Sequence, residues 1–107
     1  MKKIELVELI GDVLTQLDVL VGSMDPDDDE RKPFIKNRKA LDKMQLQLVQ
    51  SIWNENTQKY KDAAKELEEV NDDLQETIGD LDELVKTLEN VNRFVGVVDK
   101  IIQTVMP

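Results

Sequence analysis

The chain has 107 residues and a formal net charge of −9, with 40% hydrophobic and 35% charged residues and with neither cysteine nor histidine. Disulfides, thiolate metal sites and histidine-based catalysis are therefore excluded. No run of about 20 apolar residues is present to span a bilayer, and acidic residues soon follow Met1, so we expect a soluble, cytoplasmic, single-domain protein.

Few aromatic residues, four glycines and three prolines accompany an aliphatic apolar set, a composition that favours long helices. Charge falls into three blocks. Residues 1–30 carry two basic and nine acidic groups. Residues 31–65 carry nine basic and three acidic groups, and residues 66–107 carry three basic and eleven acidic groups. We expect the basic middle to lie against the acidic flanks in one bundle; the alternative is that one block docks another molecule. The net charge argues against nucleic-acid binding.

The first expected element is a helix over about residues 3–21. Its apolar residues recur at spacings of three and four, at Leu6, Ile10, Val13, Leu17 and Leu20. With their apolar neighbours they cover an arc of roughly 160°, which is wide enough for two neighbouring helices. Gly22 is expected at the left-handed position that ends the helix.

Residues 22–33 form an acidic linker that resembles a calcium loop only superficially. Asp25, Asp27 and Asp29 suit the first ligand positions, but Glu30 replaces the required glycine and Lys36 the required glutamate. We therefore predict no metal site. Asp25 as N-cap and a proline after it predict a short helical turn over 26–32, a bend at a second proline, and a helix from about 34.

Residues 34–105 are expected to form a helical region with coiled-coil heptads. Two series of positions, each repeating every seven residues, are apolar or aromatic at sixteen of eighteen places. The first series is Leu46, Trp53, Tyr60, Leu67, Leu74, Leu81, Leu88, Val95 and Ile102. The second is Val49, Asn56, Ala63, Val70, Thr77, Leu84, Val91, Val98 and Val105.

The predicted fold is an all-α antiparallel bundle of three helices with heptad packing. A turn near residues 69–73 would fold a basic arm onto an acidic one, and a second candidate turn is Ile78-Gly79-Asp80. The alternatives are a long helical hairpin dimer and a four-helix bundle with an extra break at residues 54–57.

Three groups of residues are candidates for function. Trp53 and Tyr60, with Asn56 between them, are either core or an interface anchor. The apolar tail is covered by the first helix, a second subunit or, less favourably, a membrane surface; its interface candidates are Phe94, Val98, Ile101, Ile102 and Val105. The acidic segment 66–83 is a solvated face or a docking strip for a basic partner, with candidates Glu66, Glu69, Asp73, Glu76, Asp80 and Glu83.

The expected function is a non-catalytic helical module for protein–protein interaction or assembly, with a homo-oligomer, a dimer above all, as the expected state. Ser23 and Ser51 have no histidine to activate them, so an enzyme is not expected. No cofactor is predicted. One alternative is a membrane-active or secreted helical protein that uses the apolar tail. Another is a small acidic inhibitor of a basic protein.

Overall fold

The protein is an all-helical bundle of four long helices. The computed structural model describes residues 1–106, which contain no strand. The elements are α1 (Lys3–Ser23), α2 (Arg31–Val49), α3 (Gln58–Thr77), the short 3₁₀ helix η1 (Leu81–Glu83) and α4 (Leu84–Val105). The all-α prediction is confirmed, whereas the three-helix count is wrong: the chain breaks at 50–57 as well as at 78–83, so a fourth helix forms.

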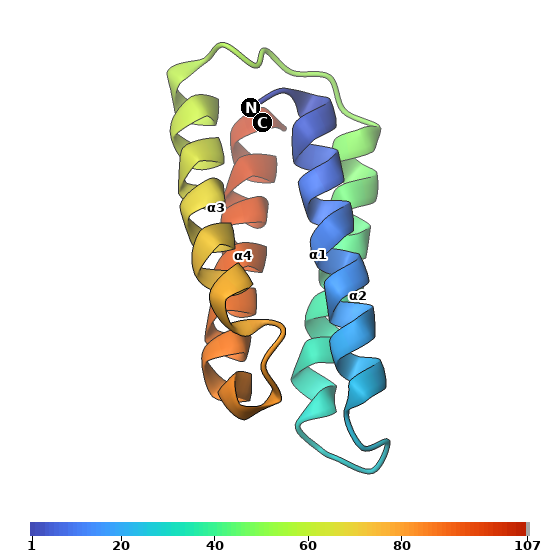
Figure 1. Ribbon diagram of the computed structural model, residues 1–107. Helices are drawn as coiled ribbons and strands as arrows, with labels where there is room; N and C mark the ends of the chain where they lie inside the picture. The colour runs from blue at the N-terminus through green and yellow to red at the C-terminus, as the bar shows by residue number, and fades with distance from the viewer. Residues whose placement is uncertain (107) are drawn as a thin grey trace.

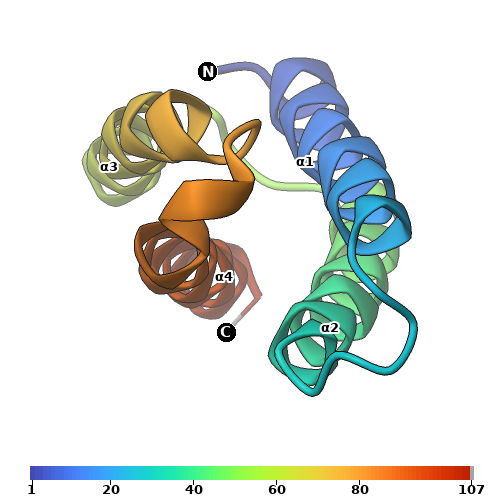
Figure 2. The same ribbon diagram turned by 60° about the horizontal axis from the view of Figure 1, so that its bottom comes forward.

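The helices run alternately down and up the bundle, as Figure 1 shows. Consecutive helices α1 and α2 form one hairpin, α3 and α4 form the other, and α2 packs against α4 to join them. In Figure 2 the hairpins appear as two layers, with α1 facing α3 across the bundle. The segment 50–57 passes over one end of the bundle to connect α2 to α3. The molecule measures 43 × 23 × 19 Å.

Helix α1 buries the apolar stripe that its sequence spacing defines. All five repeating apolar residues from Leu6 to Leu20 lie in the core. At its start, the Glu5 carboxylate accepts a hydrogen bond of 2.9 Å from the backbone N–H of Lys2. The expectation for Gly22 is wrong, because Gly22 lies within the last turn and no glycine has a positive φ in the described residues. The helix ends at Ser23 without a left-handed residue.

The acidic linker folds by local hydrogen bonds rather than as a helix. The Asp25 carboxylate accepts from the backbone N–H of Asp27, and that of Asp28 accepts from Glu30, at 3.0 and 2.8 Å. Helix α2 begins at Arg31, so the predicted bend before a helix from 34 is wrong. Pro33 lies in the first turn of α2, where a backbone N–H has no helical partner to lose.

The heptad series describes α3 fully, α4 in part, where the seam residues Val91 and Val98 are buried, and α2 not at all. All six seam positions in α3 are buried: Tyr60, Ala63, Leu67, Val70, Leu74 and Thr77. In α2 the seam residues Leu46 and Val49 are exposed. In α4 the buried stripe includes Thr87 and Phe94, which lie one residue before the seam positions. The chain breaks shift the phase between helices, so α2 exposes its seam residues and α4 replaces one of the two series by positions one residue earlier.

Sequence features account for the position of each break. The favoured turn at 69–73 is wrong, since those residues lie within α3. The chain turns at the second candidate, where the Asp80 carboxylate accepts from the N–H of Asp82 at 2.9 Å and starts η1. In the other break, Asn54 accepts from the N–H of Asn56 at 2.9 Å. Asparagine and aspartate compete with helical hydrogen bonds in this way.

Ion pairs join neighbouring helices. Arg38 of α2 contacts Asp18 of α1 at 2.9 Å, which is one contact between the basic middle and an acidic flank. The hydrogen bond from Arg38 to Asp18 raises the pKa of the guanidinium, and burial opposes the shift. The two ion pairs between α3 and α4, Asp73–Arg93 and Glu66–Lys100, each join residues of the acidic block 66–107. All these groups are partly exposed, so each pair contributes no more than about 1 kcal/mol.

Candidate functional site

The candidate site is a groove between α1 and α3. These two helices do not approach each other as closely as the other neighbouring pairs of the bundle. Two hollows, of about 310 and 380 Å³, lie along their junction. We call this feature the α1–α3 groove; it is lined by Leu9, Asp12, Thr15, Gln16, Val19, Leu20 and Ser23 of the first hairpin and by Asn71, Gln75, Ile78, Gly79 and Leu81 of the second.

A pair of amide side chains bridges the groove at mid-length. Gln16 Nε2 donates to Gln75 Oε1 at 2.7 Å, and Gln75 Nε2 donates back to Gln16 Oε1 at 2.9 Å. Gln75 Nε2 also lies 3.1 Å from Asn71 Oδ1. Gln16 lines both hollows, so the bridge lies where the two hollows meet.

The lower hollow, towards the 78–83 turn, is mainly apolar. Leu20 and Ile78 are nearly buried at its floor, while Val19 and Leu81 remain 65% and 49% exposed at its edges. A side-chain carbon added at Gly79 would meet no atom within 4 Å, so this end of the groove is open. Exposed apolar side chains next to a recess are typical of protein interaction sites.

Most of the residues that line the upper hollow are polar. Asp12, Asn71 and the bridging glutamines surround it, and half-buried Leu9 is its apolar component. Its open form and exposed carboxylate suit the binding of a side chain from a partner better than the enclosure of a small molecule.

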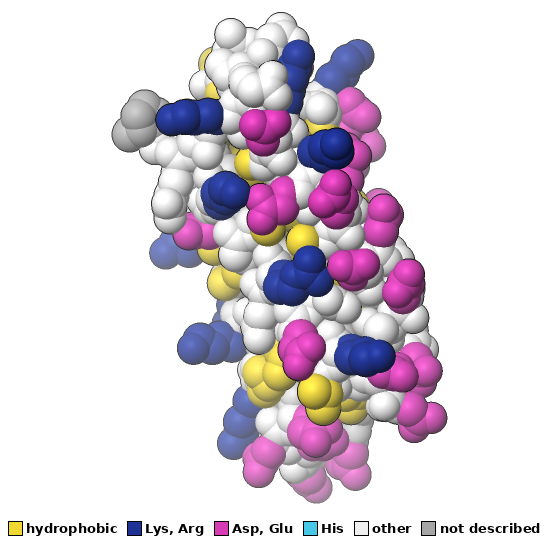
Figure 3. All heavy atoms as spheres, turned by 90° about the vertical axis from the view of Figure 1, so that its left-hand side faces the viewer, with side chains coloured by type: hydrophobic (Ala, Val, Ile, Leu, Met, Phe, Trp, Pro, Cys, Tyr) yellow, Lys and Arg dark blue, Asp and Glu magenta, His cyan; other side chains and the backbone are white. Residues whose placement is uncertain are grey.

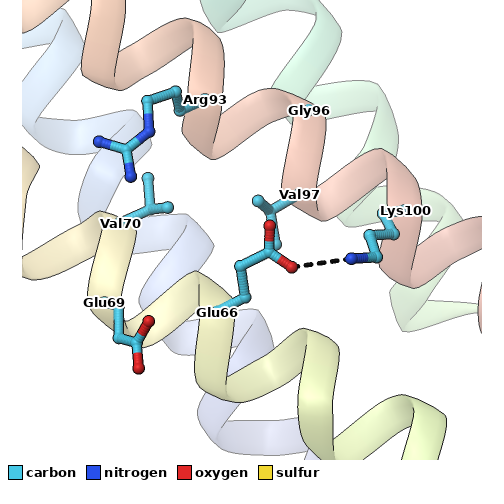
Figure 4. A pocket seen from close by; sticks show the side chains of 7 residues that line it. All are labelled: Glu66, Glu69, Val70, Arg93, Gly96, Val97 and Lys100. Carbon is cyan, nitrogen blue, oxygen red and sulfur yellow. Dashed lines mark hydrogen bonds and ion pairs between the residues drawn. The ribbon is translucent and has the colours of Figure 1, made fainter.

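The predicted acidic docking strip runs along the α4 side of α3 and continues into the 78–83 turn. Figure 3 looks at the α3–α4 side and shows acidic side chains gathered along one edge, with basic side chains among them. On the α4 side, Glu66 contacts Lys100 at 2.8 Å and Asp73 contacts Arg93 at 3.1 Å. Figure 4 shows the first pair across a hollow of about 310 Å³. These carboxylates already have basic partners within the chain.

The other strip candidates differ in their surroundings. Glu69 and Glu76 are exposed on α3, and Glu83 is half-buried at the end of η1. Asp80 is exposed and its carboxylate starts the turn, so it has a structural role. The candidates from Glu66 to Asp80 recur at spacings of three and four along one side of α3, but Glu66 and Asp73 are already paired and Asp80 starts the turn.

The aromatic candidates lie where the 50–57 segment crosses the bundle end. Tyr60 is fully buried and its hydroxyl donates to the carbonyl oxygen of Met1 at 2.8 Å. Trp53 is half-buried, with its ring centroid 5.6 Å from that of Tyr60. Burial raises the pKa of the Tyr60 phenol, the Trp53 indole opposes this in part, and the charges of Glu55 and Glu5 add to the rise. Both rings anchor the crossing segment to the rest of the chain.

The remaining interface candidates lie mostly inside the molecule. Phe94, Val98 and Ile101 are fully buried in the chain's own core, and α4 packs mainly against α3 and α2 rather than against the first helix, which was expected to cover it. Ile102 and Val105 are half-buried at its edge. The expectation that Asn56 occupies a heptad core position is wrong, because Asn56 is exposed in the crossing segment.

Sequence reasoning did not find the groove. Its key residues are polar amides, and no pattern in one sequence indicates that Gln16 and Gln75, 59 residues apart, meet across two helices. The one available signal was Val19, an apolar residue on the first helix that the apolar stripe does not include.

The described residues hold no cluster of three or more acidic side chains placed to bind a metal ion. Among residues 1–106, no helix combines the length and apolar character needed to cross a membrane. Comparisons of this chain with models of protein families, with curated proteins and with solved structures found no match.

Proposed function

We propose that this protein is a non-catalytic binding module whose α1–α3 groove receives an amphipathic helix of another protein. The observation that carries the proposal is the groove's lower end, where Val19 and Leu81 remain exposed beside an apolar floor. Amphipathic helices commonly bind by laying an apolar face into such a groove.

The dimensions of the groove suit a helix. Its lining on α1 extends from Leu9 to Ser23, which at 1.5 Å per residue corresponds to about 20 Å. A partner helix of roughly four turns has that length. The two bordering helices both run downward in Figure 1, so they form parallel walls along which a third helix can lie.

The chemistry of the lining favours binding over catalysis. Ser23 and Thr15 are its only hydroxyl groups, and both donate to backbone carbonyl oxygens four residues earlier, at 2.8 and 3.1 Å. The chain contains no histidine or cysteine that could act as a base or nucleophile beside them.

Nuclear magnetic resonance with isotope-labelled protein tests the proposal. The probe is a synthetic amphipathic helical peptide of about four turns with a strip of leucines. Amide shifts should change along residues 9–23 and 68–81, and Val19→Asp should abolish the change. Val85→Asp, at an exposed valine of α4 outside the groove, is the matched control and should leave binding intact. Shifts that map to α2 and α4 instead would refute the proposal.

Assembly with itself is a second candidate function, supported by a different surface. At the end of the bundle crossed by residues 50–57, Ile4, Leu46, Val49 and Ile52 are exposed, and Ile52 is 96% exposed. Ile4 and Val49 line one hollow between α1 and α2, so at least these two side chains are adjacent. An apolar surface of this kind suits a contact between two copies.

A further inference from the structure

Four exposed carboxylates border the upper half of the α1–α3 groove. Asp12 lines the upper hollow itself, and Glu8 lies one turn before it on α1. On α3, Glu68 and Asp72 lie about 20° and 60° around the helix from Gln75, so Glu68 borders the groove and Asp72 lies at its outer margin. Asp12 therefore faces the upper hollow, and the other three carboxylates are exposed along the rims of the two walls.

These four carboxylates have no basic partner in residues 1–106. They differ in this respect from Glu66 and Asp73, on the opposite side of α3, which are paired with basic residues of α4. Exposed like charges that gather along a recess create a negative potential there.

The chain supplies no basic residue to the lower two-thirds of either wall. No lysine or arginine occurs between Lys3 and Arg31, or between Lys65 and Lys86. Lys65 lies one turn before Glu68 at the upper end of α3 but forms no ion pair with the four carboxylates, so their charge is left for another molecule to compensate. Widely spaced single carboxylates match side chains spaced along a partner helix, in keeping with the absence of a metal-holding cluster in the described residues.

We infer that the occupant of the groove is a cationic amphipathic helix. Its lysine or arginine side chains pair with Glu8, Asp12, Glu68 and Asp72, and its apolar side chains contact Val19 and Leu81. The inference rests on the proposed function, because it names the partner of the same groove. Complementary charge of this kind raises the association rate and rejects acidic partners.

The groove also sets the spacing of the partner's side chains. Asp12 and Val19 are seven residues apart on α1, which corresponds to about 10 Å along the helix axis. The partner helix should therefore carry basic residues about two turns from its apolar anchors, on adjoining parts of one face.

Three synthetic peptides provide the test. They share one leucine strip and one length, and their flanking positions are all lysine, all glutamine or all glutamate. Binding of each labelled peptide to the full chain is measured by fluorescence anisotropy at low and moderate salt. The lysine peptide should bind most tightly and the glutamate peptide least tightly. Added salt should reduce the difference in affinity between these peptides.

Two variants with the same net charge distinguish the effect of the groove carboxylates on binding from the effect of the protein's overall charge. Both replace four exposed carboxylates by amides, and thermal unfolding verifies that both remain folded. The groove variant carries Glu8→Gln, Asp12→Asn, Glu68→Gln and Asp72→Asn. The control variant carries Asp27→Asn, Glu30→Gln, Glu76→Gln and Glu89→Gln. The groove variant should bind the lysine peptide roughly tenfold more weakly, and the control should change affinity by less than about twofold.

The outcomes distinguish the inference from the proposed function. An equal loss of affinity for the lysine peptide in both variants would show that only net charge attracts the peptide. That result would overturn the inference. Equal binding of the lysine and glutamine peptides, still abolished by Val19→Asp, would leave the groove as a binding site and overturn its cationic preference. If Val19→Asp had no effect on any peptide, the proposed function would fail as well.

Discussion

The side-chain nitrogen of Lys3 lies 2.9 Å from the carbonyl oxygen of Val49, the last residue of α2. The same ammonium group contacts the carbonyl oxygen of Ser51 at 2.5 Å and lies 5.5 Å from the centre of the Trp53 ring. The backbone N–H of Lys3 donates to Glu55 at 2.6 Å. One residue of α1 thus supplies the positive charge at the end of α2 and holds the crossing segment.

Lys3→Met should lower the free energy of unfolding by about 1 kcal/mol. The change keeps an apolar stem over Trp53 but removes charge-assisted hydrogen bonds to two carbonyl groups at a helix end. Chemical denaturation monitored by Trp53 fluorescence measures the loss. Lys36→Met, at an exposed lysine of α2, is the control and should stay within about 0.5 kcal/mol of the original protein. Equal effects would mean that the ammonium contacts of Lys3 contribute nothing.

Thr87→Val should stabilise the protein by about 1 kcal/mol. The Thr87 side chain is fully buried, and its hydroxyl has no hydrogen-bond partner in the described residues. Valine has nearly the same shape and removes the cost of burying an unpaired hydroxyl. Thr104→Val is the comparison, because the Thr104 hydroxyl donates to the Lys100 carbonyl at 2.8 Å. A lower melting temperature for Thr87→Val would show that the hydroxyl does have a partner.

Leu74→Ala and Leu81→Ala should differ widely in their effect, although the two leucines occupy equivalent heptad positions. Leu74 is fully buried in α3, so its truncation should cost about 2–5 kcal/mol. Leu81 is half exposed in η1, and its truncation should cost less than about 1 kcal/mol. Urea denaturation of both variants measures the difference. Similar large losses would support a continuous seam through the 78–83 turn.

Alkaline pH should weaken the fold through Tyr60. Burial raises the pKa of this phenol in the folded chain, so the unfolded chain loses its proton first as the pH rises. The stabilising effect is complete below the ordinary tyrosine pKa of about 10 and is lost as the pH rises towards the folded value. Because Tyr60 is the only tyrosine, ultraviolet absorbance of tyrosinate reports its ionisation directly.

Tyr60→Phe is the control for this pH dependence. The variant loses the hydrogen bond to Met1 and should be less stable at neutral pH by about 1 kcal/mol. Its stability should then fall less steeply than that of the original protein above pH of about 10. Parallel curves for the two proteins would show that lysine deprotonation, rather than Tyr60, causes the alkaline loss.

Self-association at micromolar concentration should depend on the end of the bundle that bears Ile52. Each copy carries a net charge of −9, so added salt should strengthen the association by screening repulsion. Sedimentation equilibrium of Val49→Ser with Ile52→Ser should show a shift to monomer. Val19→Ser with Val85→Ser, at exposed valines elsewhere, should not. A monomer under all conditions for the original protein would end the assembly hypothesis.

Local patterns in the sequence were enough to predict the fold class and many of the core residues. The spacing of Leu6, Ile10 and Leu17 correctly predicted which side of α1 is buried, and the heptads did the same for α3. The buried stripe of α4 was predicted only in part: Val91 and Val98 are buried as the heptads indicate, whereas Thr87 and Phe94 are buried in place of the seam residues that follow them, because the 78–83 turn and η1 shift the phase. Phe94 was recognised as apolar, but its burial depends on α4 starting after η1.

The groove was beyond single-sequence reasoning for a different reason. A hydrophobic pattern identifies the side of a helix that is buried, but it does not determine how far two helices stand apart. The Gln16–Gln75 bridge exists because α1 and α3 stay separated at that level, and this separation results from the packing of all four helices. The charge blocks did indicate acidic surfaces, and the structure shows which of their carboxylates are paired.

The route of residues 50–57 has a consequence for the order of folding. Each hairpin joins helices that are neighbours in sequence, so its contacts close short loops and should form quickly. Lys3, by contrast, reaches residues 46 to 52 positions further along the chain. We expect the hairpins to form first and the contacts of Lys3 with the crossing segment to form late. In native-state hydrogen exchange, the amides around residues 50–57 should then open at a lower free energy than those at the centre of α3.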